Sequence, residues 1–182
     1  MIASYDKALE FKPNDHDAWN NRGTALAELG RYEEVIASYD KALEFKPDDH
    51  EAWNGRGAAL YCLKRYKEAV ASFNKAIKVK PDFETGWYWN NRGLALFALG
   101  HKEEAIASYD KALQIQPNFA TAYYNKACYY STRKNINLAI STLKQAINLD
   151  SKYREMAKTD SDFDGIRQDD RFRSLLDPNL DS

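Results

Sequence analysis

The sequence predicts an all-α protein, a right-handed α-solenoid of antiparallel helix pairs, and three observations lead to this prediction. One block of residues recurs as ASYDKALEFKP at residues 3–13 and 37–47, as ASFNKAIKVKP at 71–81 and as ASYDKALQIQP at 107–117. The prolines that end these blocks are spaced 34, 34 and 36 residues apart. Apolar residues follow the helical period inside each block, and strand signals are absent. Self-similarity at such a period is typical of stacked repeat proteins.

A second block alternates with the first, so each repeated unit contains two helices. WNNRGTAL at residues 19–26 returns as WNGRGAAL at 53–60, as WNNRGLAL at 89–96 and, weakened, as YYNKACYY at 123–130. Its Trp, Gly and Leu recur at steps of four and three, as on one face of a helix. Gly30 and Gly100 stand where a first helix must end, and prolines stop the second helices.

This pattern resembles the tetratricopeptide-repeat (TPR) family, whose motif places Trp, Leu, Gly, Tyr, Ala and Pro at fixed positions over 34 residues. The first full unit matches it with Trp19, Gly23, Leu26, Gly30, Tyr32, Val35, Tyr39, Ala42 and Pro47. The third unit has Lys102 in place of the usual Tyr, and the fourth has Ser151 where Pro belongs. The resemblance implies helix-turn-helix TPR units that stack into a superhelix.

The resemblance also implies one domain over residues 1–182 with regular subdivisions. We expect a half repeat, a second helix only, at 1–15, repeats at 16–49 and 50–83, a repeat with a two-residue insertion at 84–119, a degenerate repeat at 120–152 and C-terminal capping helices at 153–182. Trp87 and Tyr88 are expected to lengthen the loop or the first turn of the third unit. The acidic C-terminal stretch is placed to supply the polar outer face that a terminal repeat needs.

The first helix lacks its partner helix, which leaves one of its faces open. Met1, Tyr5 and Ala8 lie on that face. Two alternatives follow: the chain is a fragment of a longer array, or another copy covers the face. The second alternative predicts a homo-oligomer whose interface contains Met1, Tyr5 and Ala8.

Composition and charge argue against several classes of partner. The 26 basic and 27 acidic residues give a formal charge of -1, which provides no electrostatic reason to bind nucleic acid or an anionic membrane. No apolar run approaches the ~20 residues of a membrane span. Cys62 and Cys128 lack the spacing of a zinc site or a disulfide framework. We therefore expect a cytoplasmic protein without cofactors.

The sequence offers little catalytic chemistry. His16 and His50 occupy the same place in successive units, and His101 stands alone, so no nucleophile and base are predicted to meet. Asp160, Asp162, Asp164 and Gly165 imitate the start of an EF-hand loop. Arg171, however, falls where a bidentate Glu is required, so no metal site is predicted. We expect a non-enzyme.

The predicted binding surface is the concave groove lined by the first helix of each unit. At 3.6 residues per turn, the places opposite the packing stripe can be read from the sequence. The candidate groove residues are Asn20, Asn21, Asn54, Tyr61, Trp87, Asn90, Asn91, Leu94, Phe97, Tyr124 and Asn125. An asparagine amide offers both a donor and an acceptor to a peptide backbone, and aromatic anchors commonly dominate interface energy.

Family precedents sharpen this prediction. The asparagines are similar to the ladder in the peptide-binding array of O-linked N-acetylglucosamine transferase, although Gly55 interrupts them. The clamp that grips chaperone tails uses Lys and Arg, whereas this groove carries Asp17 and Glu51 at the corresponding places. The prediction is a non-catalytic protein–protein interaction scaffold that binds a peptide segment of a partner. The alternative is a structural self-assembly module.

A further cation per unit lies beside the groove. Arg22, Arg56, Arg92 and Lys126 occupy equivalent places, next to Asp6, Asp40, Asn74 and Asp110 of the preceding second helix. We expect ion pairs between layers. A nucleic-acid-binding stripe is the alternative, but one cation per unit without net positive charge argues weakly for it.

Overall fold

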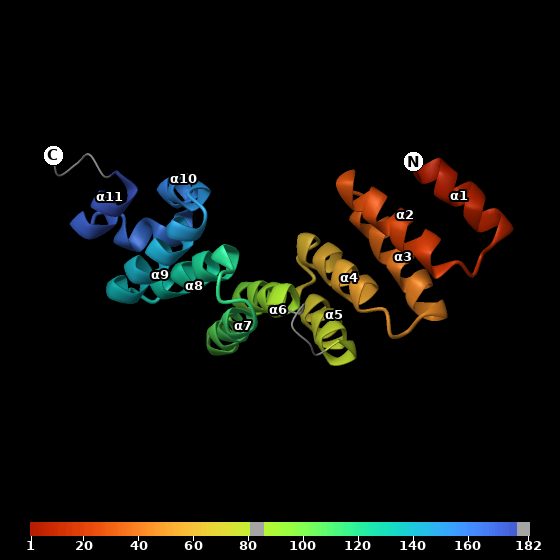
Figure 1. The fold of residues 1–182 in the computed structure, drawn as a ribbon, viewed down its shortest axis with the longest axis horizontal. Helices are drawn as coiled ribbons and strands as arrows, with labels where there is room; N and C mark the ends of the chain where they lie inside the picture. The colour runs from red at the N-terminus through yellow and green to blue at the C-terminus, as the bar shows by residue number, and fades with distance from the viewer. Residues whose placement is uncertain (81–85, 178–182) are drawn as a thin grey trace.

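The structure, a computed structural model, describes residues 1–80 and 86–177. Its helices are α1 (Ile2–Phe11), α2 (His16–Glu28), α3 (Tyr32–Phe45), α4 (His50–Cys62), α5 (Tyr66–Val79), α6 (Gly86–Ala98), α7 (Lys102–Ile115), α8 (Ala120–Thr132), α9 (Ile136–Leu149), α10 (Lys152–Thr159), the 3₁₀ helix η2 (Ser161–Ile166) and α11 (Asp170–Leu176). The pairs follow one another along the longest axis, so that α1 and α11 lie at opposite ends (Figure 1). The predicted all-α solenoid is confirmed.

Side-chain caps and left-handed turns set the helix ends. The carboxylate of Asp49 accepts hydrogen bonds from the backbone N–H groups of Glu51 and Ala52 at the start of α4. Gly30 and Gly100 follow α2 and α6 with φ of 70° and 81°, as their predicted role requires. Lys64 and Lys134 take the same conformation after α4 and α8, at φ of 60° and 56°.

Within a unit, a glycine of the first helix meets an aromatic ring of the second. A Cβ atom added to Gly57 would lie 2.7 Å from Cε1 of Phe73, and one added to Gly93 would lie 2.5 Å from Cε1 of Tyr109. Such approaches leave no room for a side chain on the first helix. The small residues of the repeat therefore set the spacing of each helix pair.

Between units, the predicted polar links are present. Arg56 donates from Nε to Oδ1 of Asp40 at 2.6 Å and from Nη1 to Oγ of Ser72 at 2.7 Å, and its guanidinium lies 5.9 Å from the ring centroid of Trp53. The equivalent cations also reach their expected partners, in the pairs Arg22–Asp6, Arg92–Asn74 and Lys126–Asp110. The expected interlayer ion pairs are present at Arg22, Arg56 and Lys126, whereas Arg92 donates a hydrogen bond to a neutral amide. These cations serve the packing of the array.

The insertion in the third unit lies before α6, which corrects the expectation for Trp87 and Tyr88. Helix α6 has thirteen residues, as α2 and α4 do, and begins at Gly86. Trp87 and Tyr88 thus occupy regular helical positions. The two extra residues therefore fall between the end of α5 at Val79 and the start of α6 at Gly86. Pro81 and the predicted unit boundary after residue 83 lie outside the described residues.

The C-terminal segment packs back onto the last helix pair. Phe163 of η2 and Phe172 of α11 are fully buried, with ring centroids 5.4 Å apart, and join the core of α8 and α9. Tyr153 of α10 stacks on Tyr124 of α8 at 4.8 Å. The described part of the predicted cap therefore contributes apolar core as well as an outer face, and residues 178–182 lie outside the description. None of the helices in the described ranges is long and apolar enough to cross a lipid bilayer.

Candidate functional site

A small apolar pocket opens between the first helices α4 and α6. Its volume is about 120 Å³, and it is lined by Ala58, Tyr61, Cys62, Phe73, Asn91 and Leu94. Three of these are candidate groove residues: Tyr61, Asn91 and Leu94. Ala58 provides the space because its side chain is short, while Phe73, held against Gly57, lies behind it. The structure thus brings part of the predicted groove together around one concavity.

Tyr61 forms one wall of this pocket. Its ring lies 5.4 Å from that of Tyr66 at the start of α5. Burial raises the pKa of Tyr61, and the negative charge of Asp162 adds to this rise. Tyr61 is therefore a neutral hydroxyl at physiological pH.

The asparagines form a ladder among themselves. Asn125 donates from Nδ2 to Oδ1 of Asn90 at 2.8 Å, and Asn91 donates from Nδ2 to Oδ1 of Asn54 at 3.1 Å. A longer bond of 3.4 Å joins Asn90 Nδ2 to Asn91 Oδ1. Each interlayer bond uses one donor of one amide and one lone pair of the next, which leaves Asn54, Asn91 and Asn125 with further capacity.

Asn90 does not line an open groove, because only 1% of its surface is exposed. Its amide links two layers and lies beneath Asn91. The helical wheel places both residues on one side of α6. The wheel cannot tell which of two neighbouring amides the next unit will cover.

The ladder does not continue to the first unit. Tyr39 occupies the space beside Gly55, where an added Cβ would lie 2.5 Å from Cζ of the ring. Asn20 donates instead from Nδ2 to Oδ2 of Asp49 at 2.7 Å. Asn21 is exposed on α2. The expected break at Gly55 is therefore real, and it results from the tyrosine packed against it.

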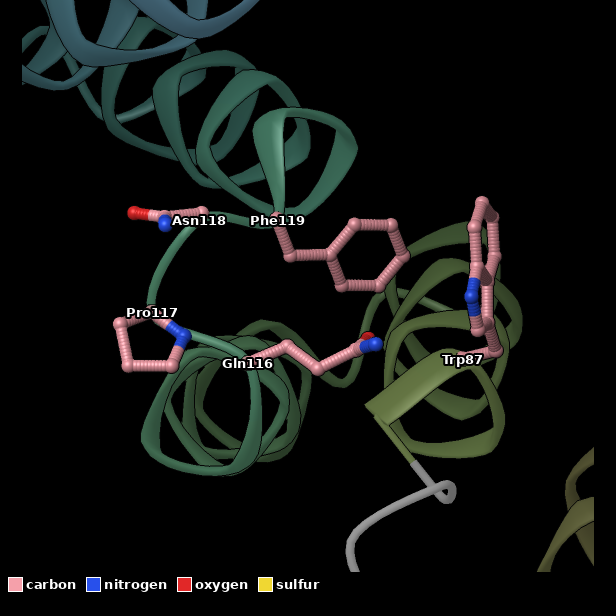
Figure 2. A pocket seen from close by; sticks show the side chains of 5 residues that line it. All are labelled: Trp87, Gln116, Pro117, Asn118 and Phe119. Carbon is pink, nitrogen blue, oxygen red and sulfur yellow. The ribbon is translucent and has the colours of Figure 1, made fainter.

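Trp87 lies apart from the pocket of Tyr61. Trp87 is 52% exposed, and its ring centroid is 4.4 Å from that of Phe119, at the turn between α7 and α8. Figure 2 shows Trp87 facing Phe119, with Gln116 between α6 and that turn. Together with Pro117 and Asn118 they line a concavity of about 380 Å³. Trp87 and Tyr61 therefore do not form one binding surface.

At the fourth unit, the chain covers its own inner wall, which corrects the expectation for Tyr124. The Tyr124 side chain is 4% exposed, its hydroxyl donates to Oδ2 of Asp160 at 2.7 Å, and its ring meets Phe163 edge-on. Cys128 on the same face is buried as well. The segment η2 thus occupies the place where the prediction put a partner.

A cluster of three potential metal ligands lies at this contact. Cys128, Asp160 and Asp162 bring their ligand atoms within 4.8 Å of one another. Burial raises the pKa of the Cys128 thiol, and burial followed by the charge of Asp160 raises the pKa of Asp162. The Tyr124 hydroxyl and the Cys128 thiol both donate to Asp160. These contacts make a hydrogen-bonded cluster of donors and carboxylates, with a protonated thiol unsuited to nucleophilic chemistry.

The histidines lie at separate helix starts. His16 Nδ1 is 3.1 Å from a carboxylate oxygen of Asp17, and His101 Nδ1 is 3.2 Å from Glu104. His50 Nδ1 shares a hydrogen bond of 2.7 Å with the Tyr88 hydroxyl. Each histidine contacts a partner on its own or the next unit.

The face of α1 that carries the predicted oligomer residues is open. Met1 is 77% exposed, Ala8 is exposed and Tyr5 is half-buried, whereas Leu9 is buried toward α2. The equivalent residues of α3, Val35 and Ala42, are 1% and 0% exposed because α2 covers them. The open face therefore corresponds to a surface that a first helix covers elsewhere in the chain.

Comparison with known proteins matches these repeats to one family and several structures. The family profile described as "Tetratricopeptide repeat" matches residues 16–49, 50–83 and 86–119, and a second profile of that description matches 108–141. No curated protein matches the chain. The structure of MamA is similar with a TM-score of 0.76 and 23% identity, over 85% of this chain and 89% of that one.

Two further solved structures bear on peptide binding. YrrB, described as a TPR protein with an unusual peptide-binding site, has a TM-score of 0.72 and 19% identity, and the match covers 99% of this chain and 95% of that one. The first TPR domain of Spaghetti (RPAP3), bound to the HSP90 peptide SRMEEVD, has a TM-score of 0.56 and 27% identity, over 59% of this chain and 83% of that one.

Proposed function

The chain belongs to the tetratricopeptide-repeat family, and from this premise we propose that it is a non-catalytic protein–protein interaction scaffold that binds a peptide segment of a partner in its groove. The observation that supports this most is the pocket between α4 and α6. It combines apolar walls, Tyr61 and Leu94, with the amide of Asn91. An apolar side chain of a peptide and its adjacent backbone require that combination.

The open part of the groove extends over the first three units. Asn21, Asn54, Asn91 and Phe97 are exposed or half-buried on α2, α4 and α6. A peptide lying across these helices would reach the remaining hydrogen-bonding capacity of Asn54 and Asn91. It would end at η2, which covers Tyr124.

The two peptide-related neighbours support the general role and suggest a difference in specificity. The peptide bound by the RPAP3 domain contains two Glu and an Asp. In this chain the groove places at the starts of α2 and α4 hold the exposed residues Asp17 and Glu51. Like charges facing each other across an interface disfavour binding, so an acidic tail is a poor ligand for this groove.

A selection experiment tests the groove. Peptides selected on the wild-type chain from a random phage-displayed library should lose at least about tenfold in affinity on an Asn91→Ala/Phe97→Ala double variant, because the amide and the apolar surface beside it are removed together. A matched Asn148→Ala/Leu149→Ala variant removes one amide and one apolar side chain from exposed positions of α9 and should bind normally. Circular dichroism melts establish that both variants are folded. Unchanged binding by the first variant rejects the groove.

Self-assembly through α1 is the second candidate function. Residues 2–13 repeat residues 36–47 letter for letter, so α1 presents to the outside the surface that α3 buries against α2. A second copy could cover this surface. Each large apolar side chain that becomes buried would contribute roughly 1.5–3 kcal/mol.

Light scattering over a concentration series separates the two candidates. Self-association should disappear in Ala8→Glu, since Ala8 lies on the open face, and persist in Ala3→Glu, whose counterpart Ala37 is exposed even within the array. A wild-type chain that stays monomeric at every concentration excludes assembly and leaves the peptide-binding proposal intact.

A further inference from the structure

The pocket between α4 and α6 has the size of a single side chain. Its volume of about 120 Å³ is somewhat smaller than the roughly 150 Å³ of an apolar cavity that accepts benzene. An aliphatic side chain such as Leu, Ile or Met therefore fits, and an indole does not. Ala58, Tyr61 and Leu94 surround that side chain with apolar surface, and Asn91 stands where the adjoining backbone would lie.

Acidic side chains lie along the groove on the helices before this pocket and on the segment η2 after it. Asp17, Glu28 and Glu51 occupy exposed groove places on α2 and α4, and the groove places of α2, α4, α6 and α8, all within the described residues, carry neither Lys nor Arg. The segment η2 adds Asp160 and Asp162 from the other side. There the carboxylates of Asp160 and Asp162 lie beside Cys128, at a groove place of α8.

Among the described residues, Lys102 brings a positive charge to the edge of the groove at Phe97. Lys102 lies 5.9 Å from the ring centroid of Phe97, and its charge counteracts the rise in the pKa of Asp162 that burial and Asp160 cause. Asp160 and Asp162 lie at the start of η2, and the exposed acids of α2 and α4 face solvent. The groove consequently carries a surplus of negative charge on both sides of an apolar pocket.

We propose that the partner of this groove is a cationic segment, in which one aliphatic side chain fills the pocket between α4 and α6 and flanking Lys or Arg side chains face Asp162 and the acidic residues of α2 and α4. This inference rests on the proposed peptide-binding function and specifies its ligand. The apolar contact provides the anchor, and charge complementarity selects the sequence around it and excludes acidic segments.

Isothermal titration with four short synthetic peptides tests the proposal. The first has a central Leu flanked on each side by Lys in a Gly and Ser background, and the others replace Lys by Ser, Lys by Glu, or Leu by Ala. The Lys peptide should bind, the Ser and Ala versions should bind about tenfold more weakly, and the Glu version should not bind. Binding of the Lys peptide should also weaken as salt rises, because exposed charges are screened.

Two pairs of variants assign the contacts. Ala58→Leu fills the pocket and should abolish binding of every Leu peptide, whereas Ala71→Leu, at an exposed position of α5, should change nothing. Asp162→Asn should weaken the Lys peptide about fivefold and leave the Ser peptide unaffected. Asp48→Asn, an exposed carboxylate in the turn before α4, is its control. Thermal melts of all four variants detect any loss of folding.

The outcomes distinguish this inference from the function on which it rests. Equal binding of the Lys and Glu peptides, or no binding of the Lys peptide, overturns the cationic specificity. If library-selected peptides then still lose binding on Ala58→Leu, the groove remains a peptide site with another preference. If no selected peptide responds to any groove variant, the proposed function fails together with the inference.

Discussion

Arg56 and its equivalents show how one side chain can serve three neighbours. Its guanidinium bonds to Asp40 of the preceding unit and to Ser72 of its own, and it covers the ring of Trp53. Four-fifths of the Arg56 side chain is removed from solvent, whereas Arg65 on the surface of the same unit pairs with Glu68 and is 45% exposed. The Arg56 contacts join two layers of the array, whereas the Arg65–Glu68 pair lies on the surface at the start of one helix.

Replacing Arg56 by Ala should therefore lower the free energy of unfolding by about 1–3 kcal/mol, since a charge-assisted bond and a second bond are lost together. Arg65→Ala should have a smaller effect because water screens that pair. Urea unfolding of both variants provides the comparison. An equal loss in the two would show that the interlayer contact contributes nothing beyond a surface ion pair.

Individual residues also show where sequence reasoning succeeds. The cations and their carboxylates could be paired in advance because both recur with the repeat, and a helical wheel places them on facing flanks. The asparagines could be placed on the right helices for the same reason. The hydrogen bonds between the asparagines depend on the distance between layers, and the burial of Asn90 depends on its neighbours. Neither can be predicted from the sequence of one helix alone.

Helix pairs are spaced by contacts between glycine and an aromatic ring, and these contacts are not equally tight. An added Cβ would lie 2.7 Å from the Phe73 ring at Gly57, but 3.1 Å from the Tyr39 ring at Gly23. The motif predicts both glycines without distinguishing them. The insertion before α6 is a second feature that the sequence predicts only in part. The sequence shows its length, but only the end of α5 at Val79 and the start of α6 at Gly86 show that the helix itself is regular.

We expect Gly57→Ala to destabilise the protein more than Gly23→Ala, although alanine favours helices by itself. At Gly57 the ring must move, which costs typically 1–3 kcal/mol for an overpacked core, whereas a shift of a few tenths of an ångström suffices at Gly23. Denaturant midpoints of the two single variants measure the difference. A more stable Gly57→Ala protein would contradict the role assigned to this contact.

Considered as a whole, the molecule is asymmetric: one end is open at α1 and the other is closed by η2 and α11. Repeat periodicity predicts the array but stops at residue 150, and the closure depends on residues that follow no period. Phe163 and Phe172 are ordinary aromatics in an acidic stretch of sequence. Phe163 packs against Tyr124 and Phe172 packs against Phe163, and these tertiary contacts explain why the groove was predicted to be one unit longer than it is.

Phe163→Ala should loosen this closure without reaching the other end. Large-to-small changes in a core cost about 3–5 kcal/mol for Phe, and repeat proteins transmit such losses mainly to adjacent layers. Hydrogen exchange should therefore accelerate in α8, α9 and α10 and stay unchanged in α2 and α3. Uniform acceleration along the chain would indicate that the array unfolds as one cooperative body.

The identity between residues 2–13 and 36–47 has a consequence for engineering. Helix α2 packs on one copy of this segment and α4 on the other. A duplicate of residues 16–49 inserted after Asp49 would therefore make, at both of its junctions, the same helix contacts that the chain already contains. The array could in that way be lengthened by whole repeats without the design of a new interface between them.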